Sequence, residues 1–246
     1  MSHLDFCAFE PHQFETICKL LGETFNTTQA ELQGFYQALR NDFDYPEWPQ
    51  KICTDRRFFT SLDERFWPTY NQANVVACDL PSLLSRGGQK TVMIVAQDAL
   101  SNVPSPEKVR IGTPYALHIK KCRHEVHNTR RYFQLLDVLL QQGYQVYLTD
   151  FYKIYVRGAS VSRKDRQRFG EVLKQEIEML NPDALITWGR KSTTAVEKLQ
   201  VGRPHYSYPH PSGSARWAWA KLMGNPATDE NIFDYWKQDL SQRLGF

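Results

Sequence analysis

The sequence lacks the signatures of several protein classes. No run of about 18 consecutive apolar residues occurs, so we expect no membrane-spanning helix and no membrane partner. The first residues include Asp5 and Glu10 and contain no apolar run of signal-peptide length. Linkers rich in Pro, Gly and Ser, low-complexity tracts and internal repeats are also missing. We therefore expect one domain spanning residues 1–246, soluble and cytoplasmic.

Cysteine is scarce and irregularly spaced. The five cysteines form no C-x-x-C pair and are odd in number, which indicates neither a disulfide framework nor a zinc or iron–sulfur site. We expect reduced thiols, no metal and no cofactor. A Gly-rich dinucleotide fingerprint and a Walker-type phosphate loop are missing too, which disfavours a nucleotide-binding transferase.

Net charge is small. Thirty basic and 27 acidic residues leave a formal charge of +3, which neither demands nor excludes a polyanionic partner. The basic residues nevertheless gather in two stretches, the first of Lys120, Lys121, Arg123, Arg130 and Arg131 and the second of Arg163, Lys164, Arg166 and Arg168. Each stretch fits a phosphate-binding face, and each fits a solvated helix face equally well.

Short apolar runs alternate with amphipathic stretches from residue 91 onward. The pattern predicts strands at 91–97, 144–149 and 183–188, and helices at about 128–142, 163–180 and 192–199. Such alternation predicts a three-layer α/β/α sandwich with a central, mainly parallel sheet and a site at the carboxyl ends of its strands.

The two ends of the chain show sequence patterns that differ from this alternation. Residues 1–90 contain helical patterns at 14–25 and 29–41 and are interpreted as a helical N-terminal cap. Residues 91–220 form the βα core, and residues 229–246 suit an amphipathic C-terminal helix.

Polar residues follow the apolar runs at four places in the core. They are Gln97-Asp98, Gly112-Thr113-Pro114-Tyr115, Tyr147-Leu148-Thr149-Asp150 and Tyr208-Pro209-His210-Pro211-Ser212. Each has an ordinary structural explanation, because Asp caps helices and turns, Tyr fills cores, and a turn His bonds to backbone groups. Their order along the chain favours a functional explanation.

In that order these motifs resemble the uracil-DNA glycosylase superfamily, over roughly residues 91–219. Gln97-Asp98 is similar to the start of the family's water-activating motif, and His210-Pro211-Ser212 to its late His-Pro-Ser loop. Tyr115 stands where the family has its base-stacking aromatic. Trp188-Gly189, followed by Ser192, is similar to another recurrent strand-to-helix segment.

The resemblance implies a DNA glycosylase, a hydrolase that cuts the N-glycosidic bond of a flipped-out base and leaves an abasic site in DNA. It implies catalytic roles for Asp98, as the anion facing the sugar and its attacking water, and for His210, as a hydrogen-bond donor to the base. The expected base contacts are Gln97, Leu100, Tyr115 and Asp150. The expected DNA contacts are Lys191, Ser192, Ser212, Ser214, Arg216 and Trp217. We expect Asp98, Tyr115, Asp150 and His210 to converge on one pocket.

Two departures from the family pattern concern the base. Asp150 stands where a uracil enzyme has Asn. A carboxylate accepts from the N4–H2 group of cytosine and, when protonated, donates to N3, whereas it opposes O4 of uracil. Ala99-Leu100 replaces the family's Pro-Tyr and leaves room at C5. We therefore predict a cytosine-type base that tolerates C5 modification, as in hypermodified phage DNA, and an antiviral defence role is a coherent hypothesis.

A third departure concerns the wedge that fills the vacated base stack. Gly213-Ser214-Ala215 carries no bulky apolar side chain, so Arg216, Trp217 or Trp219 takes over that role, or the tryptophans are packing residues of a short helix. Two other functions stay open: a uracil-DNA glycosylase of base-excision DNA repair, and a non-catalytic protein that binds modified bases. Retention of both Asp98 and His210 disfavours the second.

Overall fold

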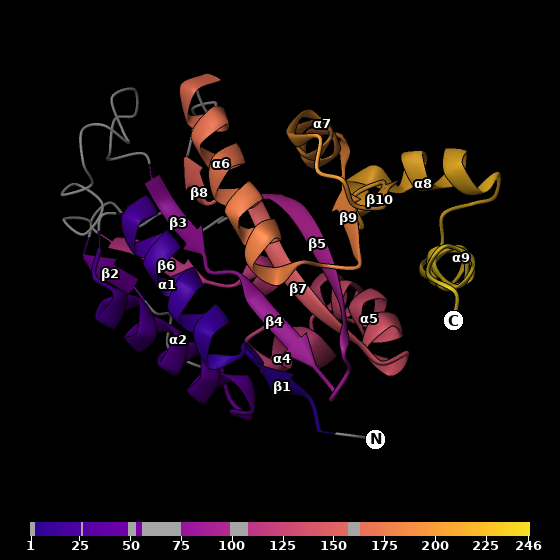
Figure 1. Cartoon of the computed structure of the whole chain (residues 1–246). Coiled ribbons are helices and arrows are strands. Elements are labelled where there is room, and N and C mark those ends of the chain that lie inside the picture. The colour runs from indigo at the N-terminus through magenta and orange to yellow at the C-terminus, as the bar shows by residue number, and fades with distance from the viewer. Residues whose placement is uncertain (1–2, 26, 49–52, 56–74, 99–107, 157–162) are drawn as a thin grey trace.

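The main sheet holds six strands in a computed structural model of the chain, which describes residues 3–25, 27–48, 53–55, 75–98, 108–156 and 163–246 (Figure 1). In spatial order its strands are β1 (Asp5–Phe6), β4 (Ser82–Ser85), β7 (Tyr144–Tyr152), β5 (Lys90–Asp98), β9 (Ala184–Trp188) and β10 (His205–Tyr208). The last four of these are parallel to one another. Since β4 pairs antiparallel with both β7 and β1, the sheet as a whole is mixed.

A second sheet extends from the end of β7. Its strands are, in spatial order, β2 (Cys53–Asp55), β6 (Lys108–Gly112), β3 (Val75–Asp79) and β8 (Ile154–Val156). Strand β8 follows β7 almost directly along the chain and pairs with β3. The carboxyl end of β3 is thereby brought to the carboxyl end of β7.

Helices lie on both faces of the main sheet. They are α1 (Pro11–Phe25), α2 (Gln29–Phe43), α4 (Lys120–His124), α5 (His127–Gln141), α6 (Arg163–Leu180), α7 (Arg190–Leu199), α8 (Arg216–Met223) and α9 (Asp229–Leu244), with 3-10 turns η2 (Pro114–Ala116) and η3 (Gly213–Ala215). Met93 and Val95 of β5 pack in a cluster with residues of α6 and α7. The alternate residues Val92 and Ile94 pack in the cluster that includes α5 and α9. The result is an α/β arrangement that is compatible with a three-layer sandwich.

The predicted core elements are present with small shifts at their ends. Strands and helices of the βα core fall where the pattern placed them, and the terminal helix is α9. Left-handed residues stop two of the helices: Gly143, with φ of 79°, follows α5, and Asn181, with φ of 47°, follows α6 and precedes a proline. These are the positions at which Gly and Asn are favoured.

The helical cap expected for residues 1–90 needs correction. It contains α1 and α2 but also contributes β1 and β4 to the main sheet and β2 and β3 to the second one. The strand β4 consists of four residues that are all buried, so its sequence shows no alternation of polar and apolar residues. A buried run this short cannot be told from part of a helix by periodicity.

Buried aromatic side chains support the ends of β9 and β10. The rings of Trp188 and Trp236 are 5.7 Å apart, and those of Tyr208 and Trp236 are 4.7 Å apart. Trp236 Nε1 donates to the carbonyl oxygen of Leu135 at 2.8 Å, which ties α9 to α5. Truncating one such side chain costs about 3–5 kcal/mol, so the loops that follow these strands start from a rigid base.

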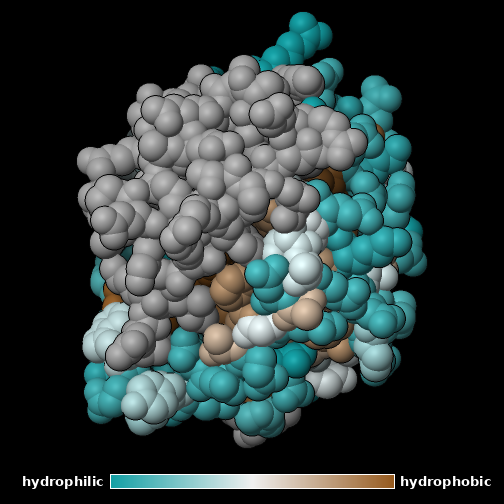
Figure 2. Space-filling model, turned by 90° about the vertical axis from the view of Figure 1, so that its left-hand side faces the viewer, coloured by the Kyte–Doolittle hydropathy of each residue, from teal (hydrophilic) through white to brown (hydrophobic). Residues whose placement is uncertain are grey.

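Few large hydrophobic side chains reach the surface among the described residues. The face shown in Figure 2 is mostly hydrophilic where it is described, with small hydrophobic groups between the polar ones. The large exposed ones among the described residues are Tyr45, Trp48, Trp217 and Leu222. No helix in the described ranges is long and apolar enough to cross a membrane.

Candidate active site

Two predicted site residues lie at the carboxyl ends of neighbouring parallel strands. Asp98 is the last residue of β5, and Asp150 lies near the end of β7. Asp150 is the register partner of Ala96, two residues before Asp98 on the same strand. Because side chains alternate along a strand, Asp98 and Asp150 project from the same face of the sheet.

Asp98 is half-buried and forms a hydrogen bond with the residue before it. Gln97 Nε2 donates to Asp98 Oδ2 at 2.5 Å. Burial raises the pKa of the Asp98 carboxyl, while the Gln97 hydrogen bond and the charge of Lys191 lower it. The pKa is raised overall, and these two neighbours limit the rise by favouring the ionised carboxylate.

Tyr115 and His210 are in direct contact. The Tyr115 hydroxyl lies 3.1 Å from His210 Nε2, and the backbone N–H of Ser212 donates to His210 Nδ1 at 3.1 Å. Burial, followed by the charge of Arg131, lowers the pKa of His210 to about 4. His210 is therefore neutral at pH 7, and because Nδ1 accepts, its proton is on Nε2. The imidazole presents an N–H donor, with the Tyr115 oxygen as its acceptor.

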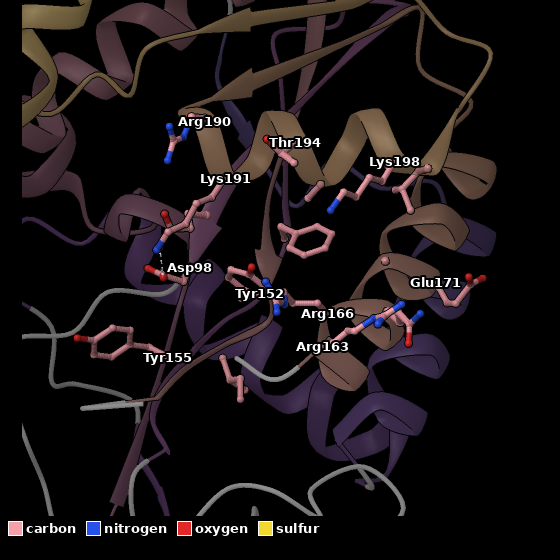
Figure 3. Close-up of a pocket in the computed structure, with 17 residues that line it drawn as sticks. Asp98, Tyr152, Tyr155, Arg163, Arg166, Glu171, Arg190, Lys191, Thr194 and Lys198 are labelled. Carbon is pink, nitrogen blue, oxygen red and sulfur yellow. Dashed lines mark hydrogen bonds between the residues drawn. The ribbon is translucent and has the colours of Figure 1, made fainter. Parts of the chain in front are cut away.

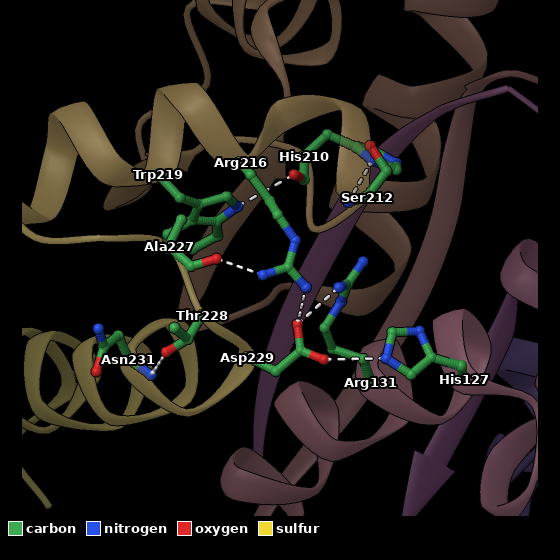
Figure 4. A network of polar contacts seen from close by, with 10 residues as sticks. All are labelled: His127, Arg131, His210, Ser212, Arg216, Trp219, Ala227, Thr228, Asp229 and Asn231. Atoms are coloured by element: carbon green, nitrogen blue, oxygen red, sulfur yellow. Dashed lines mark hydrogen bonds and ion pairs between the residues drawn. The ribbon is translucent and has the colours of Figure 1, made fainter.

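The backbone around this pair is specialised. Tyr115 has φ of 59°, a left-handed value that is rare for a large side chain and that persists only where the surroundings impose it. Its ring packs against that of Tyr132 at 4.4 Å. On the other side, Trp219 Nε1 donates to the carbonyl oxygen of His210 at 3.1 Å and holds its loop (Figure 4).

Asp150 is 2% exposed, and its Oδ2 has no hydrogen-bond partner within the described part of the chain. Burial raises its pKa well above the usual range, and the negative charges of Asp79 and Asp98 raise it further. Burial likewise raises the pKa of the Tyr115 hydroxyl, with Asp150 as the largest charge acting on it. Asp150 is thus a buried carboxyl group that favours its protonated form.

Asp79 is a third carboxylate that the sequence analysis missed. It ends β3, is buried, and has its pKa raised to about 6 by burial and by Asp98, against the charge of Arg110. An Asp that ends an apolar run was the signal that identified Asp98. The signal was overlooked here because this segment was interpreted as part of a helical cap.

A buried ion pair lies behind Asp150. Lys153 Nζ donates to Glu176 Oε2 and to the Asp150 carbonyl oxygen, both at 2.7 Å, and to Thr149 Oγ1 at 2.6 Å. The side chains of Lys153 and Glu176 are 0% exposed. This pair links α6 to the backbone of the residue that carries the buried carboxyl group.

The four principal residues do not line one shared pocket. Asp98 and Gln97 line a pocket of about 1070 Å³ beside α6 and α7, and Tyr115, Asp150 and His210 are not among its lining residues. The Tyr115 hydroxyl already occupies the His210 donor, and Asp150 is covered. The convergence of all four residues on one pocket therefore stays a prediction, and the pocket beside Asp98 does not include the other three.

The predicted DNA contacts divide into three groups. Lys191 is exposed and lines the pocket, and Trp217 is 73% exposed. Trp219, a candidate only for the wedge, is fully buried and packs in the core. Ser212 is half-buried and Ser214 is exposed, and their hydroxyl oxygens lie 2.9 Å apart.

Two of these candidates serve the fold. Ser192 is 1% exposed and donates to the carbonyl oxygens of Trp188 and Gly189, so we remove it from the DNA contacts. Arg216 is bound to Asp229 and to the Ala227 carbonyl oxygen (Figure 4).

The two basic stretches also differ. Arg123 of the first stretch is buried, donates to the carbonyl oxygens of Leu117 and Phe43, and is a structural residue. Arg163 and Arg166 of the second stretch line the pocket.

The remaining predictions concern Leu100 and metals. Leu100 lies outside the described residues. Within the described residues, no group of three His, Cys, Asp or Glu side chains is placed to hold a metal ion.

No family model matches the chain, and no curated protein is significantly similar to it.

Proposed function

We propose that this protein is a DNA glycosylase that hydrolyses the N-glycosidic bond of a flipped-out, cytosine-type base in DNA, with a fold of the uracil-DNA glycosylase type. The observation that carries the proposal is the contact of Tyr115 with a neutral histidine donor (His210), together with a half-buried carboxylate (Asp98) and a buried carboxyl group (Asp150) at the ends of neighbouring strands. As the bond breaks, positive charge develops on the sugar and negative charge on the base. The Asp98 carboxylate suits the sugar, and the His210 and Asp150 donors suit the base.

The reaction separates an electron pair from the sugar. The C1′–N1 bond breaks, the base leaves with the electron pair, and C1′ becomes cationic. Asp98 stabilises that cation, and water adds its oxygen to C1′ while Asp98 takes the proton. Gln97 keeps the carboxylate oriented through its hydrogen bond.

The base receives hydrogen bonds as it becomes negative. The Nε2–H of His210 donates to the Tyr115 hydroxyl oxygen in the free protein and donates to the base O2 in the reaction. This requires the Tyr115 side chain to move aside, and its ring then stacks on the base. A neutral histidine is the suitable donor, since the proton stays on Nε2 throughout.

Asp150 selects the base in this proposal. Its protonated form donates to N3 of cytosine and accepts from N4–H2, which matches both groups on that edge. Burial and the neighbouring charges of Asp79 and Asp98 favour this protonated form. Uracil offers O4 and N3–H at the same positions, so both contacts are mismatched as long as the Asp150 proton stays on the oxygen that faces N3. A requirement for a C5-modified cytosine restricts the enzyme to foreign DNA and fits a cytoplasmic antiviral role.

Release of a free base tests the proposal. The protein is incubated with DNAs that contain uracil, cytosine or one of several C5-modified cytosines, and free bases and alkali-labile sites are measured. We expect release of a cytosine-type base by the wild type and none by Asp98→Asn. Asp234→Asn is the matched control, because Asp234 is exposed on α9. If no DNA of the panel loses a base, the proposal is wrong.

A further inference from the structure

The pocket beside Asp98 is larger than one flipped base needs. Its volume of about 1070 Å³ is at the upper limit of small-ligand pockets, which run from about 300 to 1,000 Å³. Asp98 lies at one end of it, Gln97 also lines it, and α6 and α7 form its walls (Figure 3). The reacting sugar therefore occupies only the end near Asp98, and the rest is available to another part of the ligand.

The walls of this pocket are strongly basic. Its cationic lining residues are Arg163, Arg166, Arg190, Lys191 and Lys198, and its acidic ones are Asp98 and Glu171. Within the described part of the chain none of these five cations forms an ion pair. Figure 3 shows them entering from both helices, α6 and α7. Unneutralised cations on opposite walls favour a ligand that carries several negative charges.

The pocket also contains aromatic side chains. Phe151, Tyr152 and Tyr155 line it. Tyr152 packs on Phe169, with ring centroids 6.3 Å apart. Tyr155 is half-buried and has no such ring partner among the described residues. Aromatic rings beside cations are the combination that binds unpaired nucleotides, through stacking and phosphate contacts.

We infer that this pocket binds single-stranded polynucleotide, namely the unpaired nucleotides next to the target nucleotide. The cations of α6 and α7 contact their phosphates, and Tyr155 stacks on a base. The inference rests on the proposed function in taking Asp98 as the group that faces the target sugar, but strand binding itself is measurable without catalysis. Duplex DNA fits the pocket less well, because its bases are stacked and paired.

Binding of an oligothymidylate is the test, because it has neither cytosine nor a modification. Fluorescence anisotropy gives Kd at several salt concentrations for the wild type and for the double variant Arg166→Gln/Lys198→Gln. We expect the double variant to bind at least about fivefold more weakly. Its slope of log K against log salt should be about 1.4 smaller, since each phosphate contact in single strands contributes about 0.7.

The matched control is Lys174→Gln/Lys237→Gln, which removes two exposed cations outside the pocket. It should keep the wild-type Kd within about twofold. Arg166→Lys should keep the wild-type salt slope. Tyr155→Leu should weaken binding about tenfold and leave the salt slope unchanged. Thermal denaturation confirms that each variant is folded.

Three results overturn the inference: an unchanged Kd and slope in the pocket variant, an equal loss in the control variant, or equal wild-type affinity for the duplex of the same sequence. The last would assign the cations to backbone contacts on the surface. If the strand binds as expected but no base is released from any DNA, the inference stands and the proposed function fails.

Discussion

Replacing Asp150 by Asn should reverse the preference between cytosine-type bases and uracil. The amide has almost the same shape, but it always carries two donor hydrogens on nitrogen and an acceptor oxygen. With its nitrogen facing O4 and its oxygen facing N3–H it pairs with uracil, and in that same orientation it opposes N4–H2 and N3 of cytosine. Asp150 is 2% exposed, so water cannot compensate a mismatch there. A buried unpaired polar group costs about 1–3 kcal/mol, and every 1.4 kcal/mol is a factor of ten.

One mismatch therefore changes the rate of base release by about five- to a hundredfold, and two mismatches by more. Single-turnover release rates are measured for uracil and for a C5-modified cytosine in the same oligonucleotide. We expect the ratio of the two rates to shift towards uracil by at least tenfold in Asp150→Asn and to stay constant in Asp234→Asn. If Asp150→Asn leaves the ratio unchanged while both rates remain measurable, Asp150 does not select the base.

Four further predictions follow from the site. Asp98→Asn should reduce base release about a thousandfold or more, while fluorescence anisotropy shows normal strand binding. His210→Ala should reduce release about a hundredfold. Near-normal turnover in either variant removes that residue from the mechanism. The pKa of His210 is lowered from 6.5 to about 4, so the unfolded chain takes up a proton at this residue before the folded chain does as the pH falls. Urea denaturation should therefore show the wild type losing stability relative to His210→Asn between pH 6.5 and 4. Lys153→Met leaves Glu176 unpaired in the core and should cost about 3–5 kcal/mol of unfolding free energy, and a loss below 1 kcal/mol would show that the pair is not buried as described. Leu100→Tyr should slow release of bulky C5-modified bases and leave unmodified ones unaffected, as judged by single-turnover rates.

Much of the core could be predicted from periodicity, because its elements are long and patterned. Helix α6 spans Arg163–Leu180 as expected, and β5 and β7 are nine-residue strands with continuous buried stretches. The antiparallel strand β4 could not be predicted. It has only four residues, and its pairing with β7 depends on contacts that are distant in the sequence. Local patterns carry no information about such partners.

For the site, the sequence identified the ends of strands but not the contacts between side chains. Asp98 and Asp150 could be singled out because each follows an apolar run. The burial of Ser192 against carbonyl oxygens could not, since an exposed and a buried helix-start serine look alike in sequence. The proximity of Asp79 to Asp98 depends on the second sheet, which brings β3 to the end of β7.

The distribution of charge assigns different roles to the three clustered carboxyl groups. Asp79, Asp98 and Asp150 are close enough to affect one another's pKa, so they do not all ionise together at little cost. Asp98 is the most exposed of them. The Gln97 hydrogen bond and the Lys191 charge both lower its pKa, against the effect of burial. Asp150 is covered, and its neighbours raise its pKa. Environments that separate the pKa values of neighbouring acids separate their functions too. In the proposed reaction, Asp98 is accordingly the group assigned to the cationic sugar, and Asp150 the protonated group assigned to the departing base.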